Sequence, residues 1–366
     1  MEDVAEFLDT MRKPLEGARR IPGPYPYYGA SGIVDYVDGY LFNEELVLLS
    51  EDGANITDRN YPVCFLASGK YWVNNHAHVL RLKDGNENNF VCTSLERKDY
   101  KQYNSGMAMP KLNQEVCRRI PIGCPSFNEQ KKIGDYFREL DNLITLHQRK
   151  CDETKQLKKF MLQKMFPKNG EKNPEIRFEG FTDDWEQRKV SDITNSYSGG
   201  TPKSGTSEYY DGNIPFIRSG EIYSDKTELF ISELGMNYSS AKRVHIGDIL
   251  YALYGATSGE VSRAKLDGAI NQAILAIIPN QDINADFLVE WFRKEKDKII
   301  NTYLQGGQGN LSAQIIKELV VMIPSKEEQY KLGNYFTYIN RLITLHQRKC
   351  EKLKELKKFM LQKMFV

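Results

Sequence analysis

Two long stretches of the chain place hydrophobic residues at the spacing of an amphipathic helix. Residues 128–166 contain no proline and a single glycine, and helix-forming Lys, Leu, Gln, Glu and Met dominate them. Ser126 and Glu129 have the spacing of a capping box at the start, and Pro167 follows the end. The pattern predicts one uninterrupted helix, roughly 58 Å long for about 39 residues.

The second stretch repeats the first. Residues 125–166 and 324–365 align without a gap at a constant offset of 199, and 28 of the 42 positions are identical. A long amphipathic helix needs a partner, and its own copy is the simplest one. We expect antiparallel pairing about a pseudo-two-fold axis, with the first copy's stripe widened by Phe137, Ile144, Cys151 and Met165. The residues expected to pair are Ile133, Leu140, Leu143, Leu157, Leu332, Ile339, Leu342 and Leu356.

The segments before and between the repeats hold short hydrophobic runs bounded by Gly, Asn and Asp, which predicts many short strands. The two inserts hardly resemble each other, although residues 53–54 match 255–256 and residues 75–77 match 271–273. We expect one scaffold with two different surfaces. The predicted strands are residues 46–49, 63–66, 71–73 and 77–80 in the first insert, and 214–217, 248–252 and 273–278 in the second.

The predicted fold class is α+β, with two α/β domains separated by two long antiparallel coiled-coil helices. The first α/β domain is expected at residues 1–124 and the second at 190–323. The central helix and a polar linker occupy residues 125–189, and the C-terminal helix occupies 324–366. The linker is rich in Lys, Asn, Gly and Pro, as breaker segments are.

Composition narrows the class of protein. The formal net charge is +1, so the chain as a whole is not a polycation, which weakens any claim that it alone grips nucleic acid tightly. The six cysteines form no CxxC pair, which favours free thiols in a reducing compartment. No signal core and no stretch of membrane-spanning length is evident. We expect a cytoplasmic protein that does not contact a membrane.

Catalytic motifs are missing from the sequence. No GxGxxG is present, and residues 60–63 match an adenine-methyltransferase motif poorly because they lack its adjacent prolines and closing aromatic residue. Residues 200–207 imitate a phosphate-binding loop, but Thr206 stands where lysine is required. His76 and His78 are expected on one strand face without a third ligand, which favours packing over a metal site. We expect a non-catalytic chain that holds no metal and no cofactor.

Four motifs in the chain resemble those of one known family. They are the tandem LITLHQRK…LKKFMLQKMF, the segment IRFEGFTDDWEQRK at residues 176–189, YPYYGASG at 25–32 and QGNLS at 308–312. Together they resemble the specificity subunit of type I restriction-modification systems over nearly the whole chain. One departure is visible: residues 190–193 align with 1–4, so nothing like residues 176–189 leads the first insert.

The resemblance implies a function for each part. Each insert would be a target-recognition domain that reads one half of a split sequence in double-stranded DNA. The helices would act as a ruler and dock two modification subunits, which hold S-adenosylmethionine and methylate adenine. Restriction subunits, the translocating nucleases, would join to cut unmethylated DNA.

The residues support part of this independently. Half-sites on one DNA face lie about 34 Å apart, and a helix of roughly 58 Å can span that separation. Identical helices with different inserts predict an asymmetric bipartite site. Each candidate contact residue also has a plainer interpretation as local packing or ordinary surface polarity. The candidates are Arg19, Arg20, Tyr25, Tyr27, Tyr28, Lys70, Asn74, Asn75, His76, Thr201, Lys203, Arg218, Ser219, Tyr254, Gln308 and Asn310.

A different class of protein fits the same helical pattern. Paired helices can serve as a coiled-coil scaffold whose two inserts bind other proteins. Basic and amide-rich loops on the inserts favour DNA recognition, whereas acidic faces would favour the scaffold.

Overall fold

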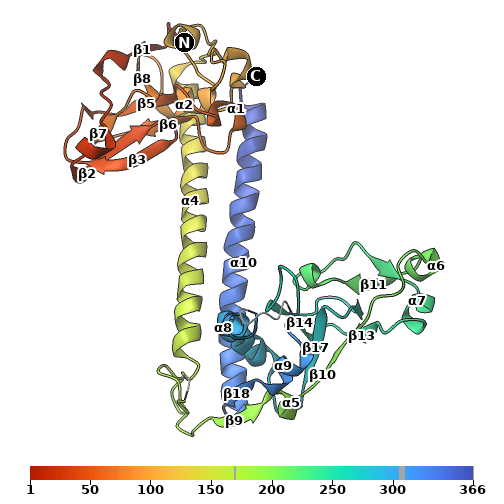
Figure 1. The fold of residues 1–366 in the computed structure, drawn as a ribbon. Helices are drawn as coiled ribbons and strands as arrows, with labels where there is room; N and C mark the ends of the chain where they lie inside the picture. Colours follow the sequence, from red (N-terminus) through yellow and green to blue (C-terminus); the bar gives the residue numbers. More distant parts are fainter. Residues whose placement is uncertain (169, 305–309, 366) are drawn as a thin grey trace. The chain divides into compact units, whose positions relative to one another are not determined.

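The computed structural model describes residues 1–168, 170–304 and 310–365, and it divides into two compact units. Unit 1 comprises Met1–Arg149 and Gln347–Val366, and unit 2 comprises Lys150–His346. Each unit takes one part of both long helices, α4 (Phe127–Lys164) and α10 (Lys326–Lys363) (Figure 1). The chain is therefore a mixed helix and strand protein of the predicted class. The finer domain boundaries stay a prediction.

Two four-stranded sheets form the strand part of unit 1, as far as its residues are described. One sheet is antiparallel with the order β1-β8-β5-β6, and the other has the order β3-β2-β7-β4 with β2 and β7 parallel. The strands are β1 (Ala5–Phe7), β2 (Pro22–Gly29), β3 (Gly32–Val37), β4 (Phe42–Asn43), β5 (Leu46–Ser50), β6 (Cys64–Ala67), β7 (Lys70–Val73) and β8 (Ala77–Leu82). The helices are η1 (Asp9–Met11), η2 (Gly17–Arg19), α1 (Asn55–Asp58), α2 (Asn88–Glu96), η3 (Tyr100–Tyr103) and α3 (Gln114–Arg118).

Unit 2 repeats this topology strand for strand. Its sheets have the orders β10-β17-β14-β15 and β12-β11-β16-β13, and β11 and β16 are parallel as β2 and β7 are. The strands are β10 (Thr194–Ser198), β11 (Ile214–Ile217), β12 (Phe230–Ile231), β13 (Lys242–Val244), β14 (Ile249–Ala252), β15 (Val261–Arg263), β16 (Gly268–Ile270) and β17 (Ile274–Pro279). The helices are α5 (Val190–Ile193), α6 (Ser207–Tyr210), η4 (Ser219–Glu221), α7 (Glu233–Asn237), α8 (Ala285–Tyr303) and α9 (Ala313–Glu318).

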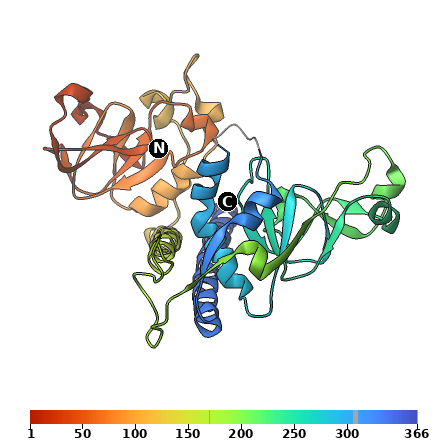
Figure 2. The ribbon, with the colours of Figure 1, turned by 60° about the horizontal axis from the view of Figure 1, so that its bottom comes forward.

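Unit 2 also has a two-stranded ribbon. A linker follows α4 and leads to β9 (Glu186–Lys189), which pairs antiparallel with β18 (Val320–Ile323) (Figure 2). All seven strands expected from the sequence are present, with ends within two residues of the prediction. The common scaffold inferred from faint collinearity is confirmed, because the two units share one strand order.

The residue-by-residue match of the two inserts differs from the sequence comparison. The N–H of Glu51 donates to the carbonyl of His76 at 2.9 Å, and the N–H of Leu253 donates to that of Ala273 at 2.8 Å. His76 is therefore the equivalent of Ala273, whereas the sequence comparison paired Ala77 with it. The match was wrong by one residue because so few identities fix the alignment there.

A buried glutamine and a glycine attach the α/β part of unit 1 to α4. The Gln130 amide accepts from the N–H of Glu87 at 3.1 Å and donates to the carbonyls of Gly85 and Pro125 at 3.2 and 2.9 Å. One turn later, a Cβ on Gly134 would overlap the Glu87 carboxylate that caps α2. The glycine is therefore required by the close approach of the cap, not by helix propensity.

The same attachment recurs in unit 2. The Gln329 amide accepts from the N–H of Asn284 at 2.9 Å and donates to the carbonyls of Asp282 and Pro324 at 3.3 and 3.0 Å. A Cβ on Gly333 would stand 2.6 Å from the Asn284 Oδ1 that caps α8. The repeated Gln-x-x-x-Gly of the sequence is therefore a repeated anchor for each α/β part.

The long helices run antiparallel within each unit. In unit 1 the Lys357 ammonium lies 2.6 Å from the Asp141 carboxylate, and Cys350 Sγ lies 4.0 Å from the carbonyl of Ile144. In unit 2 Cys151 Sγ lies 3.9 Å from the carbonyl of Ile343. The buried seam thus passes through the two repeat cysteines.

Four of the eight residues expected to pair the two long helices are not buried in the structure. Ile133, Leu140, Leu332 and Ile339 are buried, but in the cores that join each helix to its own α/β part. Leu143, Leu157 and Leu356 are instead 43%, 48% and 40% exposed, and Leu342 is half-buried. A heptad stripe drifts by about 20° per heptad on a straight helix, so positions in the later turns leave the seam. None of the described helices is long and apolar enough to cross a membrane.

Candidate DNA-recognition surfaces

Loops that are distant in sequence meet at the ends of β5 and β8 in unit 1. The Asp52 carboxylate contacts His76 Nδ1 at 2.9 Å, and Asp52 forms an isolated β-bridge with Lys111. The Arg12 guanidinium donates to the carbonyl of Ala77 at 2.8 Å. We call Arg12, Asp52, Asn75, His76 and Lys111 the unit 1 loop cluster.

The equivalent loops of unit 2 carry other side chains. Thr201 Oγ1 donates to Gln272 Oε1 at 2.8 Å, and the Tyr254 hydroxyl donates to the backbone carbonyl of Gln272. Lys203 is exposed two residues beyond Thr201. Asn310 is exposed and precedes Leu311, whose N–H donates to the carbonyl of Leu253 at 3.0 Å, next to Tyr254. We call Thr201, Lys203, Tyr254, Gln272 and Asn310 the unit 2 loop cluster. Gln308, also predicted from the sequence, lies outside the described residues.

The two clusters differ in chemistry although the scaffold is shared. The unit 1 loop cluster combines cations, a carboxylate and an imidazole, whereas the unit 2 loop cluster is mostly hydroxyl and amide. Base edges are distinguished by such donor and acceptor patterns. Sequence reasoning missed Arg12, Asp52, Lys111 and Gln272; the match of residues 53–54 with 255–256 was a signal that could have located the loops.

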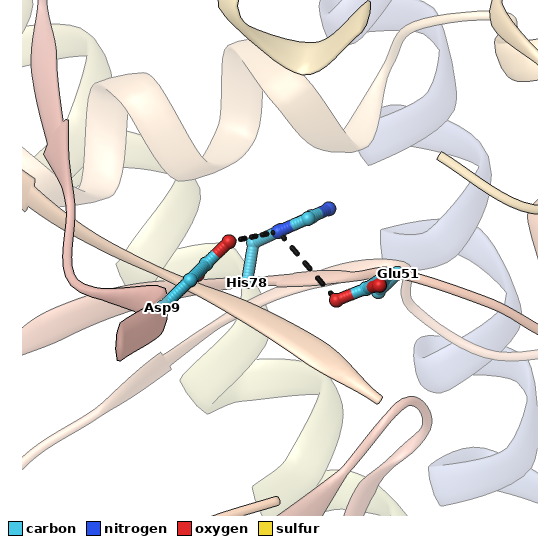
Figure 3. Close-up of side chains that lie close together, drawn as sticks. All are labelled: Asp9, Glu51 and His78. Atoms are coloured by element: carbon cyan, nitrogen blue, oxygen red, sulfur yellow. Dashed lines mark hydrogen bonds and ion pairs between the residues drawn. The ribbon is translucent and has the colours of Figure 1, made fainter. Parts of the chain in front are cut away.

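A buried network of charged side chains lies next to the unit 1 loop cluster and includes its Arg12. His78 Nδ1 lies 2.6 Å from Asp9 Oδ2 and 3.8 Å from the Glu51 carboxylate (Figure 3). His78 Nε2 lies 2.7 Å from the carbonyl of Leu112. A carbonyl and a carboxylate both accept, so both ring nitrogens carry hydrogen and His78 is a cation. Arg12 closes the network at 2.6 Å from Glu51.

Charge and burial oppose each other in this network. Burial would lower the pKa of His78, but the hydrogen bond to Asp9, with the neighbouring Cys117, raises that pKa to about 10. Burial likewise would raise the pKa of Asp9, and the hydrogen bond from His78 outweighs it and lowers that pKa. The pair therefore holds the turn that carries Arg12 against β8.

The same residues do not suit a metal ion. Asp9, Glu51 and His78 bring three potential ligand atoms within 4.8 Å of one another, but an imidazole protonated on both nitrogens has no lone pair to offer. His76 and His78 also have separate surroundings, contrary to expectation: His76 is half-exposed beside Asp52, and His78 is 1% exposed. His76 precedes β8, so strand alternation does not govern it.

A second surface of unit 1 lies on the β3-β2-β7-β4 sheet. Tyr25 packs edge-on against Tyr40 at 5.3 Å between ring centroids, and the Lys70 ammonium lies 4.8 Å over the Tyr40 ring. The adjoining edge strand exposes Ile33, Val34 and Tyr36. The structure thus brings the predicted Tyr25 and Lys70 together through a residue that the sequence did not flag.

Three other candidates have packing roles. Tyr27 is 1% exposed, and its hydroxyl accepts a backbone N–H at 2.9 Å. Tyr28 stacks on Phe65 at 5.8 Å between centroids. Asn74 is 6% exposed and accepts from the N–H of His76 at 2.8 Å, which shapes the loop. The plainer interpretation of these three residues as packing therefore fits the structure better than base contact.

A carboxylate neutralises each predicted arginine. Arg19 lies 3.4 Å from Glu16, and Arg20 lies 3.2 Å from Asp35. Arg218, beside the half-buried Ser219, contacts Glu221 at 2.7 Å and Glu228 at 3.0 Å. The Arg218 guanidinium lowers the pKa of Glu221 to about 2. A DNA phosphate would have to displace these acids to engage the arginines.

Each long helix also exposes a leucine and a phenylalanine one turn apart. Leu157 and Phe160 of α4 are 48% and 49% exposed within unit 2. The equivalent Leu356 and Phe359 of α10 are 40% and 54% exposed within unit 1. We call each pair an apolar helix face. Clustered exposed apolar side chains mark interaction sites more often than isolated ones do.

A duplicated α/β scaffold with dissimilar exposed loops defines a class of two-part recognition protein. The family model of the type I restriction modification DNA specificity domain matches residues 1–156 and 182–355, and the chain belongs to that family. It is thus a DNA-specificity protein of type I restriction-modification systems. In those systems this component recognises DNA and the chemistry is carried out elsewhere, in agreement with the missing catalytic motifs.

Individual relatives agree with the family. A putative type I restriction enzyme specificity subunit of Haemophilus influenzae is 28% identical over 354 residues, covering 91% of this chain and 84% of that protein. The MjaVIII specificity subunit of Methanocaldococcus jannaschii is 23% identical over 389 residues, covering 97% and 88%. The fold resembles the crystal structure of the type I S subunit from M. genitalium, with a TM-score of 0.74, 14% identity and coverage of 100% and 94%.

Proposed function

We propose that the chain reads one asymmetric, two-part DNA sequence, with one part read by each unit, and that it docks two modification subunits. The observation that carries the proposal is a frame repeated at 28 of 42 positions that presents two unlike loop clusters. Equal frames fix equal geometry, whereas unlike side chains select unlike bases.

The proposed readers are the two loop clusters, with the sheet face around Tyr25, Tyr40 and Lys70 as an additional contact in unit 1. Asn75 and Gln272 occupy equivalent positions in the two clusters, and an amide side chain can pair bidentately with adenine. The chain's net charge of +1 favours a shared grip on DNA, in which partner subunits supply much of the phosphate contact.

The apolar helix faces support docking of two partners. Leu157 with Phe160 and Leu356 with Phe359 are the same surface presented twice, so one kind of subunit would bind at each. In the proposal these subunits are adenine methyltransferases that carry S-adenosylmethionine, and restriction subunits join through them. The assembly would act on cytoplasmic DNA.

Methylome sequencing tests the proposal that each unit recognises one half of a two-part DNA sequence. Cells expressing the chain with its modification partner should carry methylated adenine in one interrupted, asymmetric motif. Gln272→Ala should change the bases selected in one half only, and Asn75→Ala those in the other half only. An uninterrupted motif, or a change in both halves from either variant, would refute the division of labour.

Native mass spectrometry tests the proposal that one modification subunit binds at each apolar helix face. The wild-type chain should bind two modification subunits, and the double variant Leu157→Asp with Phe160→Asp should bind one. Lys155→Asp is the matched control, because its exposed side chain lies roughly 160° around the helix from Leu157. Two bound subunits in the double variant would exclude the apolar helix face as the dock.

A further inference from the structure

A short closed loop of unit 1 presents two methionines to solvent. In residues 104–110, which we call the methionine loop, Met107 is 99% exposed and Met109 is 62% exposed. Ala108 between them is exposed as well. Exposure of a large apolar side chain is unfavourable, and burial against a partner recovers that free energy. The packing of unit 1 therefore does not account for a methionine at position 107.

Hydrogen bonds hold the methionine loop in one shape. Asn104 Oδ1 accepts from the N–H groups of Gly106 and Lys111, both at 2.9 Å. The N–H and the hydroxyl of Ser105 both donate to the carbonyl of Lys111, at 2.8 and 2.9 Å. A Cβ on Gly106 would overlap the carbonyl oxygen of Met109, so the chain passes close to itself there. The loop is therefore closed at its base and holds its tip in a defined position.

The base of the methionine loop joins the unit 1 loop cluster. The N–H of Gly53 donates to the carbonyl of Pro110 at 3.0 Å. The next residue, Lys111, forms the β-bridge with Asp52, and both belong to that cluster. The two methionines are thus attached to the same loops as the side chains proposed to read bases.

Charge and size indicate a DNA duplex as the partner of the loop tip. From the start of η3 to Lys111, residues 100–111 contain two lysines, Lys101 and Lys111, and no acidic residue. Glu51 lies 3.3 Å from Lys111 but also pairs with Arg12, so it neutralises only part of this charge. Two apolar side chains are too few for a stable protein interface, which takes about 20–30 residues from each partner. They suffice for one base step, since a single apolar side chain can enter between two base pairs.

We propose that Met107 enters DNA as a wedge between two adjacent base pairs, with Met109 packing beside it. Apolar wedges of this kind partly unstack the base step and kink the duplex. Lys101 and Lys111 contact phosphates on the two sides of that step. The inference rests on the proposed function, because the step lies beside the bases that the unit 1 loop cluster reads.

The wedge adds a kind of sequence selection that the loop cluster does not supply. Pyrimidine–purine steps unstack and kink more readily than other steps. Such a step is therefore favoured at the wedge, although no side chain hydrogen-bonds its base edges. Burial of Met107 in the stack offsets part of the unstacking energy, so the wedge acts mainly on the shape of the duplex.

The wedge belongs to one half of the target only. The offset of 199 relates Leu112 to Leu311, and their N–H groups donate to Glu51 at 2.7 Å and to Leu253 at 3.0 Å. Residues 305–309 therefore match the tip and end of the methionine loop, and they lie outside the described residues. Their sequence is Gln, Gly, Gly, Gln and Gly, which carries no apolar side chain.

Energy transfer between dyes at the two ends of a DNA duplex tests the wedge. The sample is the chain assembled with its modification subunits on a duplex that carries the methylated motif. We expect the wild-type and Met107→Ser complexes to differ by a kink of about 20° or more. Met107→Leu, which keeps an apolar side chain, should retain the wild-type kink. Ile246→Ser is the control and should change nothing, because Ile246 is 65% exposed at the opposite end of β14 from the unit 2 loop cluster.

Fluorescence of 2-aminopurine locates the wedge. The base replaces each adenine in and beside the motif, one at a time, and its emission rises where stacking is lost. We expect a rise that depends on Met107 at one step of the half whose bases change in Asn75→Ala. Methyltransferases extrude their target base, so a rise at the methylated adenine should be equal in wild-type and Met107→Ser complexes.

The outcomes separate this inference from the proposed function. Equal energy transfer for wild-type and Met107→Ser complexes, on a duplex that both methylate, would overturn the wedge and leave the proposed function standing. An emission rise confined to the methylated adenine would have the same consequence. Absence of an interrupted motif from the methylome would overturn the proposed function and the wedge with it.

Discussion

Glu290 of α8 joins three helices of unit 2, and its removal should destabilise that unit strongly. Its side chain is 3% exposed, and one oxygen forms an ion pair with the α4 ammonium of Lys158 at 2.8 Å. The other oxygen accepts from Asn340 of α10 at 2.9 Å and from Arg293. One carboxylate thus contacts side chains of α4, α8 and α10.

The size of the effect follows from burial. Lys158 is only 15% exposed, and burial lowers its pKa while Glu290 opposes that shift. Breaking a buried pair by removing one partner costs about 3–5 kcal/mol, because the remaining charge is uncompensated. We therefore expect about that loss of unfolding free energy for Glu290→Leu. The double variant Glu290→Leu with Lys158→Met should recover about 2 kcal/mol or more of it.

Intrinsic fluorescence can isolate unit 2. The chain has three tryptophans, of which Trp185 and Trp291 lie in unit 2 and Trp72 lies in unit 1. In a Trp72→Phe background, urea unfolding followed by tryptophan emission reports unit 2 alone. Lys155→Met, on an exposed lysine of the same helix, is the control and should stay within about 0.5 kcal/mol.

The double-mutant cycle decides the outcome. A coupling energy below about 0.5 kcal/mol between Glu290 and Lys158 would refute the reasoning. So would equal losses for Glu290→Leu and the Lys155→Met control. Either result would mean that solvent, rather than the carboxylate, compensates the lysine.

Two further outcomes concern unit 1 and its counterpart. Gly134→Ala and Gly333→Ala should each lower stability by about 1–3 kcal/mol in thermal unfolding, since the new Cβ displaces a helix cap; a gain of the size expected from helix propensity would contradict this. The pKa of His78 is raised to about 10 in the fold, from 6.5. Its stabilisation relative to His78→Gln is therefore full below about pH 6.5 and lost as pH rises through about 10. A constant difference in Tm across that range would exclude a charged His78.

Burial decided which predicted residues can act. Tyr25, Tyr27 and Tyr28 read alike in sequence, yet Tyr27 and Tyr28 face a core and Tyr25 faces a surface. The sequence did not predict the β2–β3 hairpin or its register shifts, which decide the direction of each ring. Asn75 and His76 were located because they lie between two predicted strands, residues 71–73 and 77–80. Sequence reasoning did not identify Arg12 as a candidate, because Arg12 lies in a segment that shows no strand periodicity.

The sequence by itself determined the duplication, seven of the strands of the two inserts and the long helices, because these follow from identity and local periodicity. Only the tertiary structure decided which helix face is buried, since the α/β parts cover Ile133 and Leu332 and leave Leu157 and Leu356 exposed. It alone also decided the make-up of the two loop clusters. Those depend on contacts between segments far apart in the chain, and no local pattern encodes them.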